Sequence, residues 1–255
     1  VDSPVIEFHC SESDLDIDFK GSSKTSELVI HAPEIMGREL VDICSRDHRI
    51  STESIKILQR TVDKTLYIAE QFPSAKPKIV MHLGGMSLDM LKEKNPNDEM
   101  IGRAIDAFKK LEYNDSDLQI LPENLPPRPW YLGGQWHQYG FMPPEDMVKF
   151  CEYFNLGMTF DICHAGLYCN HEGISIGDYA AKVRHLVKHM HISDTKGIDG
   201  EGVQVGEGDM DFDAVFEQMK NTDTSWVTEI WSGHLHHGAG CRHSLHRLGK
   251  YNHLL

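Results

Sequence analysis

The most constraining feature of this sequence is the alternation of short, β-rich apolar runs with stretches of helical periodicity. The apolar runs lie at residues 4–9, 27–31, 78–82, 118–123, 158–161, 189–192 and 226–230. Apolar positions recur every three or four residues over 52–70, 98–112, 144–155, 176–188 and 213–219, which predicts helices there. Strands that alternate with helices indicate βαβ units and a parallel sheet.

The length of 255 residues suits one α/β barrel. We therefore predict an α/β fold of the TIM (β/α)8 type. Seven strands are visible, whereas a closed barrel has eight, so we predict that the first strand is missing from this chain. The sequence shows no internal linker, repeat or low-complexity tract, so we predict one domain over residues 1–255. Because the chain begins at Val1, a barrel excised from a longer polypeptide is one interpretation.

Composition limits the classes of partner. The net charge of −14 disfavours nucleic acid, since an acidic surface repels phosphates. No apolar run approaches the roughly 20 residues of a membrane span, and no signal peptide is visible, so we expect no membrane partner. The six cysteines show no CxxC spacing and are too few for a disulfide scaffold, which favours a cytoplasmic protein.

Six predicted strands after the first end in, or next to, a potential metal ligand. These residues are His31, His82, Glu123, Asp161, His191 and Glu229, and His164 follows Asp161 by three positions. In a parallel barrel the carboxyl ends of the strands meet at one face, so the six side chains are expected to converge. Each alone is more typical of a solvated carboxylate or a hydrogen-bonded core histidine. Their coincidence at six strand ends indicates a metal site.

The same segments also resemble a known family. The short motifs at 29–33, 81–85, 122–124, 160–165, 191–194, 206–209 and 228–229 follow one another in the order and spacing of the xylose isomerase-like TIM barrels. That superfamily includes sugar isomerases and epimerases, inosose dehydratases and endonuclease IV. The resemblance runs from about Val5 to Gly233 and lacks the family's first strand.

This resemblance implies one divalent cation held by Glu123, Asp161, His191 and Glu229. Three carboxylates and one imidazole suit Mn²⁺, Mg²⁺ or Co²⁺, with Zn²⁺ as an alternative. The resemblance further implies that Glu123 and Glu229 move protons at the carbon next to a carbonyl. We expect no nucleotide cofactor, because residues 206–209 lack the strand-then-helix context of a dinucleotide fingerprint.

His31, His82 and His164 match further metal ligands of endonuclease IV. The Asp-x-His pair of that enzyme is replaced here by Asp199-Gly200-Glu201-Gly202. We therefore interpret the three histidines as residues that hydrogen-bond a sugar or a ligating carboxylate, with a second metal ion as the alternative.

The segment 126–139 is rich in aromatic residues and glycine, and it is expected to overhang the site. Trp130, Trp136 and His137 are predicted to contact substrate, while packing against the barrel or a contact with another protein is an equal alternative. Lys196 is predicted to bind a phosphate or a sugar hydroxyl, or else to pair with a nearby aspartate. We interpret the histidines from His234 onward as a solvated surface. We place Cys163 on the strand of Asp161, which is the sixth strand of the barrel when the missing first strand is counted.

The leading functional hypothesis is a metal-dependent isomerase or epimerase that acts on a sugar or sugar derivative. One alternative is a metal-dependent phosphodiesterase resembling endonuclease IV. The other is a non-catalytic sugar-binding barrel domain of a larger protein of the sugar-acid synthase type. A homo-oligomer or a fused partner domain is left open by the sequence.

Overall fold

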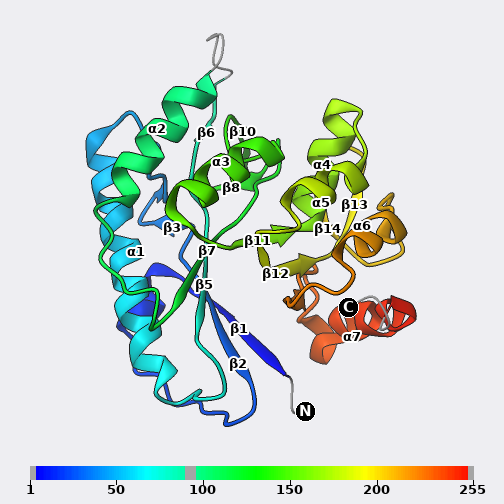
Figure 1. Ribbon diagram of the computed structural model, residues 1–255, viewed down its shortest axis with the longest axis horizontal. Helices are drawn as coiled ribbons and strands as arrows, with labels where there is room; N and C mark the ends of the chain where they lie inside the picture. Colours follow the sequence, from blue (N-terminus) through cyan, green and yellow to red (C-terminus); the bar gives the residue numbers. More distant parts are fainter. Residues whose placement is uncertain (1–3, 90–95, 252–255) are drawn as a thin grey trace.

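The protein is described by a computed structural model, which defines residues 4–89 and 96–251 (Figure 1). Its barrel strands are β1 (Val5–His9), β2 (Glu27–His31), β5 (Lys78–Met81), β7 (Gln119–Pro122), β11 (Met158–Asp161), β12 (Val187–Ile192) and β15 (Ser225–Thr228). All pairings between these strands are parallel. The seven predicted strands are therefore confirmed, as is the α/β TIM-barrel-like class.

The barrel strands form two sheets that follow the order of the chain. One sheet runs β1-β2-β5-β7 and the other runs β11-β12-β15. In residues 4–89 and 96–251, a single parallel bridge between Glu123 and Thr159 connects them. Within the described residues, β1 and β15 make no backbone pairing with each other. Leu28, Val29 and Ile30 of β2 are all fully buried, as is typical of parallel strands covered on both faces.

Helices lie outside the strands, α1 and α2 beside the first sheet and α4, α5 and α6 beside the second (Figure 1). The helices are α1 (His48–Ala69), α2 (Pro96–Phe108), α3 (Pro144–Phe154), α4 (Ile162–Glu172), α5 (Ile176–Val183), α6 (Phe212–Met219) and α7 (Leu235–Leu248), with 3-10 turns η1 (Glu12–Asp16) and η2 (Gly249–Tyr251). Five of them confirm the predicted helices. The predicted ends at 109–112 and 184–188 are wrong, because both helices stop earlier.

Two helices were not predicted from the sequence. Helix α4 begins directly after β11, so Cys163 lies in its first turn and its assignment to the sixth strand is wrong. Helix α7 is interrupted at residues 236–238, where the backbone takes left-handed conformations. His234, His236, His237, His243 and His246 are exposed, which agrees with a solvated surface, and His253 lies outside the described residues.

Short antiparallel pairs of strands lie in the loops that follow the carboxyl ends of the barrel strands. They pair β3 (Ile35–Met36) with β4 (Glu39–Leu40), β6 (Met86–Ser87) with β10 (His137–Gln138), β8 (Trp130–Tyr131) with β9 (Gly134–Gln135), and β13 (Asp194–Lys196) with β14 (Gly200–Val203). No helix in residues 4–89 or 96–251 has both the length and the apolar character needed to cross a membrane.

An aromatic cluster joins α2 to α3. The ring of Phe150 lies 5.4 Å from that of Phe108, 5.6 Å from Phe141 and 5.2 Å from Phe154, measured between centroids. Phe150 is fully buried. Helix α3 begins at Pro144, which suits a first helical turn, and ends before Asn155, whose left-handed φ of 55° closes the helix.

We expect Phe150→Ala to lower the free energy of unfolding by about 3–5 kcal/mol, because it leaves a cavity among three rings. Urea denaturation followed by circular dichroism measures this. Tyr153→Ala is the control on the same helix, since Tyr153 is 56% exposed and its loss is expected to cost less than about 1 kcal/mol. Equal effects of the two substitutions would contradict this account of the packing.

Asp146 gives the fold a pH dependence. Burial raises its pKa from 3.8 to about 6, although its carboxylate accepts a hydrogen bond from the Phe141 backbone N–H at 3.1 Å. The protonated form of Asp146 is favoured in the folded protein. This stabilisation of the folded state is fully present below pH 3.8 and is lost as the pH rises through 6. Asp146→Asn keeps the acceptor oxygen and removes the charge.

We therefore expect the stability of Asp146→Asn relative to wild type to increase between pH 4 and pH 7. The increase should be on the order of 1 kcal/mol, because solvent screens part of the interaction. Urea denaturation at several pH values provides the measurement. A difference between the two proteins that does not change with pH would refute this prediction.

Candidate metal centre

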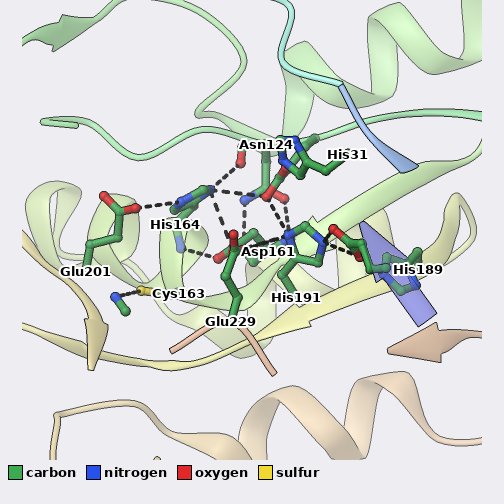
Figure 2. A network of polar contacts seen from close by, with 12 residues as sticks. His31, Asn124, Asp161, Cys163, His164, His189, His191, Glu201 and Glu229 are labelled. Atoms are coloured by element: carbon green, nitrogen blue, oxygen red, sulfur yellow. Dashed lines mark hydrogen bonds and ion pairs between the residues drawn. The ribbon is translucent and has the colours of Figure 1, made fainter. Parts of the chain in front are cut away.

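Four side chains from the carboxyl ends of four barrel strands converge, and Figure 2 shows three of them, Asp161, His191 and Glu229. Glu123 follows β7, Asp161 ends β11, His191 lies in β12 and Glu229 follows β15. One potential ligand atom from each lies within 4.8 Å of the others. His191 Nδ1 is 2.9 Å from Glu229 Oε2, 3.1 Å from Glu123 Oε1 and 3.9 Å from Asp161 Oδ2.

The backbone fixes the two glutamates at the last positions of the strand ladders. The Glu123 N–H donates to the Met81 carbonyl at 3.0 Å, and the Glu229 N–H donates to the Ile192 carbonyl at 3.1 Å. The side chain of Glu123 is 1% exposed, whereas that of Glu229 is 36% exposed. Glu229 is thus the more accessible of the two from outside the barrel.

The carboxylate of Glu123 is shared among four histidines. Its Oε2 lies 3.3 Å from His31 Nε2 and 3.1 Å from His82 Nε2, and its Oε1 lies 3.1 Å from His191 Nδ1 and 3.6 Å from His164 Nδ1. Burial alone would raise the pKa of Glu123. The charge of His191 and the hydrogen bonds from His191, His31 and His82 hold this pKa well below its usual range.

Asp161 is oriented by its neighbours. Its backbone N–H donates to Asn124 Oδ1 at 3.0 Å, and the Asn124 amide donates back to the Asp161 carbonyl at 2.8 Å. As the N-cap of α4, Asp161 Oδ1 accepts the His164 backbone N–H at 2.6 Å. The other oxygen, Oδ2, faces His191. Burial raises the pKa of Asp161 to about 7, against the charge of His164 and with the help of Glu123 and Glu229.

Opposite charges balance one another in this site. Burial lowers the pKa of His191, but Glu7, Glu229 and Glu123 together raise it well above its usual value. Burial raises the pKa of Glu229, yet His191 brings it down to about 2. The negative charge of a buried carboxylate must be compensated by a nearby positive charge. A protonated histidine supplies that charge here, and a divalent cation would supply it equally well. Three carboxylates and an imidazole at these distances fit a divalent cation.

The sequence analysis missed two further groups of the site, Glu34 and Tyr131. Glu34 Oε1 lies 3.4 Å from His82 Nε2, and also faces His31 and His9 at 3.9 and 3.8 Å. Burial raises the pKa of the Tyr131 hydroxyl, and the carboxylates of Glu34, Glu201 and Glu123 add to the effect, with a hydrogen bond to Glu34. The spacing of Glu34 three residues after His31 was the available signal for this carboxylate.

Glu201 was also missed as a contact of the site. It lies on β14, and its Oε1 is 3.4 Å from His164 Nε2. The buried carboxylate of Asp194 fixes the loop that follows β14. It accepts backbone N–H groups from Thr195, Gly206, Gly208 and Met210 at 2.8–3.0 Å. A Cβ on Gly208 would lie 2.0 Å from the Thr195 carbonyl oxygen, so only glycine fits there.

The four predicted substrate contacts, Trp130, Trp136, His137 and Lys196, line cavities or are exposed, and their contact with substrate stays a prediction. Trp130 is half exposed, and Trp136 donates its indole N–H to the Tyr131 carbonyl and lines a cavity of about 460 Å³. His137 lines another cavity, of about 360 Å³, and Lys196 is exposed. In the described part of the chain, none of the four forms a hydrogen bond or ion pair with the clustered carboxylates. Tyr131, from the same hairpin as Trp130, reaches the site instead.

Comparisons with known proteins agree with this architecture. A family model described as xylose isomerase-like TIM barrel matches residues 11–251. A D-tagatose 3-epimerase-like protein is 18% identical with a TM-score of 0.71, covering 97% of this chain and 88% of that one. An L-ribulose 3-epimerase is 15% identical with a TM-score of 0.69, covering 97% of this chain and 83% of that one. At these identities the likeness shows the fold alone.

This chain is also similar in sequence to a curated protein. The uncharacterized protein MJ1311 of Methanocaldococcus jannaschii is 23% identical over 210 residues, which are 80% of this chain. The match spans 64% of the length of that protein.

The structure suggests a sharp test of metal binding at Asp161. We expect Asp161→Asn to lower Mn²⁺ affinity at least about tenfold, because it removes one charged ligand while asparagine still caps α4. Isothermal titration calorimetry measures the affinity. Asp211→Asn is the matched control, since Asp211 also caps a helix, accepting the Ala214 N–H at 3.0 Å, and lies outside the cluster. Equal affinity in both variants would exclude Asp161 as a ligand.

Proposed function

Because this chain belongs to the xylose isomerase-like TIM barrel family, we propose that it is a divalent-metal-dependent isomerase or epimerase of a sugar or sugar derivative. The observation that supports the proposal most directly is the placement of Glu123 and Glu229. Both carboxylates approach the same nitrogen of His191, within reach of Asp161. The names of two similar structures, a D-tagatose 3-epimerase-like protein and an L-ribulose 3-epimerase, point to the same chemistry.

In this proposal, Glu123, Asp161, His191 and Glu229 hold the cation. When bound, the cation polarises the carbonyl and hydroxyl oxygens of the sugar and so acidifies the carbon beside the carbonyl. The more exposed Glu229 takes the proton from that carbon, and the C–H electron pair passes toward the carbonyl. The ionised Glu123 receives a proton from the His31 imidazolium through the contact between Oε2 and Nε2 and passes it to the other face of the same carbon, which inverts the configuration. Glu229 keeps the proton that it took until solvent removes it.

The neighbours of Glu123 support its role in proton transfer. His31 donates Nδ1–H to the Ala32 carbonyl at 2.9 Å, and hydrogen bonds and the charge of Glu123 overcome burial to raise the pKa of His31 to about 9. His31 and His82 therefore fix Glu123 Oε2 and leave Oε1 directed toward His191. A fixed carboxylate is a more effective acid–base group than a mobile one, because its orientation is already determined.

A phosphodiesterase remains the second candidate. The observation that favours it is that His31, His82 and Glu123 also form a group with ligand atoms within 4.8 Å of one another, so the centre offers donors for more than one ion. The net charge of −14 and the absence of the Asp-x-His pair from this sequence weigh against it. A non-catalytic sugar-binding barrel domain is the third candidate.

We expect Glu123→Gln and Glu229→Gln each to lower kcat about 10²–10⁴-fold without unfolding the protein, because each removes a proton-transfer group. The assay follows epimerisation of D-tagatose and L-ribulose with Mn²⁺, and NMR in D₂O follows deuterium entry at the carbon beside the carbonyl. Glu39→Gln is the control, because Glu39 pairs with Arg49 on the surface.

Three outcomes would contradict the proposal. Near-normal turnover by either glutamine variant would exclude the two-glutamate mechanism. Cleavage of abasic duplex DNA, with two or three equivalents of metal, would favour the phosphodiesterase. A bound sugar with no turnover in any divalent metal would favour the binding domain.

A further inference from the structure

Glu7 is a buried carboxylate to which neither the sequence analysis nor the proposed mechanism assigns a role. It lies on β1, and its side chain is 11% exposed. Its carboxylate accepts hydrogen bonds from two imidazoles of β12, His189 Nε2 at 2.9 Å and His191 Nε2 at 3.1 Å. These histidines are two residues apart and therefore share a face of the strand, as Figure 2 shows for their rings.

The two nitrogens of His191 face different groups. Nδ1 faces Glu229 and Glu123, whereas Nε2 faces Glu7. An ionised carboxylate only accepts hydrogen bonds, so Glu7 requires a hydrogen on Nε2. With Nε2–H fixed in this way, Nδ1 is the nitrogen that binds a cation. A cation would displace the hydrogen that Nδ1 donates to Glu123, and Nδ1 points at the three carboxylates of the metal centre.

The orientation of Glu7 is itself determined by a row of donors. Lys78 Nζ lies 2.8 Å from Ser225 Oγ and, as an ammonium group, only donates. The Ser225 hydroxyl is then free to donate to His189 Nδ1, 2.7 Å away. His189 therefore has its own hydrogen on Nε2, which donates to Glu7. Every hydrogen bond in the row points toward the Glu7 carboxylate.

We propose that Glu7 is a positioning residue for the metal centre. It holds His191 in the tautomer and ring orientation that direct Nδ1 toward Glu123, Asp161 and Glu229, and Lys78, Ser225 and His189 in turn hold Glu7. The inference rests on the metal binding of the proposed function but not on the identity of the reaction. Carboxylate partners of this kind typically change metal affinity 10–100-fold when they are removed.

The test is titration of the full chain with Co²⁺, followed by calorimetry and by the visible absorption of the bound ion. We expect Glu7→Ala to lower Co²⁺ affinity about 10–100-fold. Glu7→Gln should lower it about 3–10-fold, since the amide oxygen still accepts from His191 but has no charge. Both variants should shift the absorption bands, because the ligand geometry changes.

Two further variants complete the experiment. Ser225→Ala should lower affinity about two- to tenfold, since it removes one hydrogen bond that orients His189. Glu152→Gln is the matched control, because Glu152 also contacts a histidine, His185 at 3.3 Å, but lies on the surface. Its affinity and spectrum should equal those of the wild type.

The results separate this inference from the proposed function. Unchanged affinity and spectrum in folded Glu7→Gln, with normal binding by the wild type, would overturn the role of Glu7 alone. This variant decides the question if Glu7→Ala does not fold. Two Co²⁺ equivalents in the wild type, one of them lost in Glu7→Ala, would show that Glu7 is itself a ligand and would also overturn the inference. No Co²⁺ binding by the wild type would overturn both proposals.

Discussion

The buried carboxylate of Glu123 is the group on which the arrangement of the site depends. An ionised carboxylate inside a barrel is costly unless its oxygens are paired. Here Oε2 contacts His31 and His82 from the first sheet, and Oε1 contacts His191 from the second. The requirement to compensate one negative charge therefore explains why histidines lie at the ends of three different strands.

The residues at and beside Glu123 also connect the two sheets. Between β7 and β11 the backbone contributes a single bridge, at Glu123 and Thr159. Beside it, the side chain of Asn124 makes two hydrogen bonds to the backbone of Asp161. A polar side chain thus completes a connection that backbone ladders make elsewhere in the barrel, and the residues that build the site also contribute to the fold.

The sequence predicted what depends on local periodicity. The seven strands and five helices have clear apolar patterns, and the ligand candidates at their ends followed from them. Helix α4 was missed because it is buried on most sides, from Ile162 to Leu167, so its apolar residues mark no single face. Tyr131 and Glu201 were missed because they lie on hairpins whose paths depend on tertiary contacts. Glu7 lies in a predicted strand, but alternation alone does not say which face is the interior.

The division of the ligand set between two sheets has a consequence for dynamics. A cation bound by Glu123 on one side and by Asp161, His191 and Glu229 on the other would cross-link segments that are remote in sequence. Separation of the sheets and release of the ion would then be one cooperative event. Amide hydrogens of β7 and of β12, although they belong to different sheets, would exchange with solvent through the same opening. The rate of metal loss would thus report how often the barrel opens.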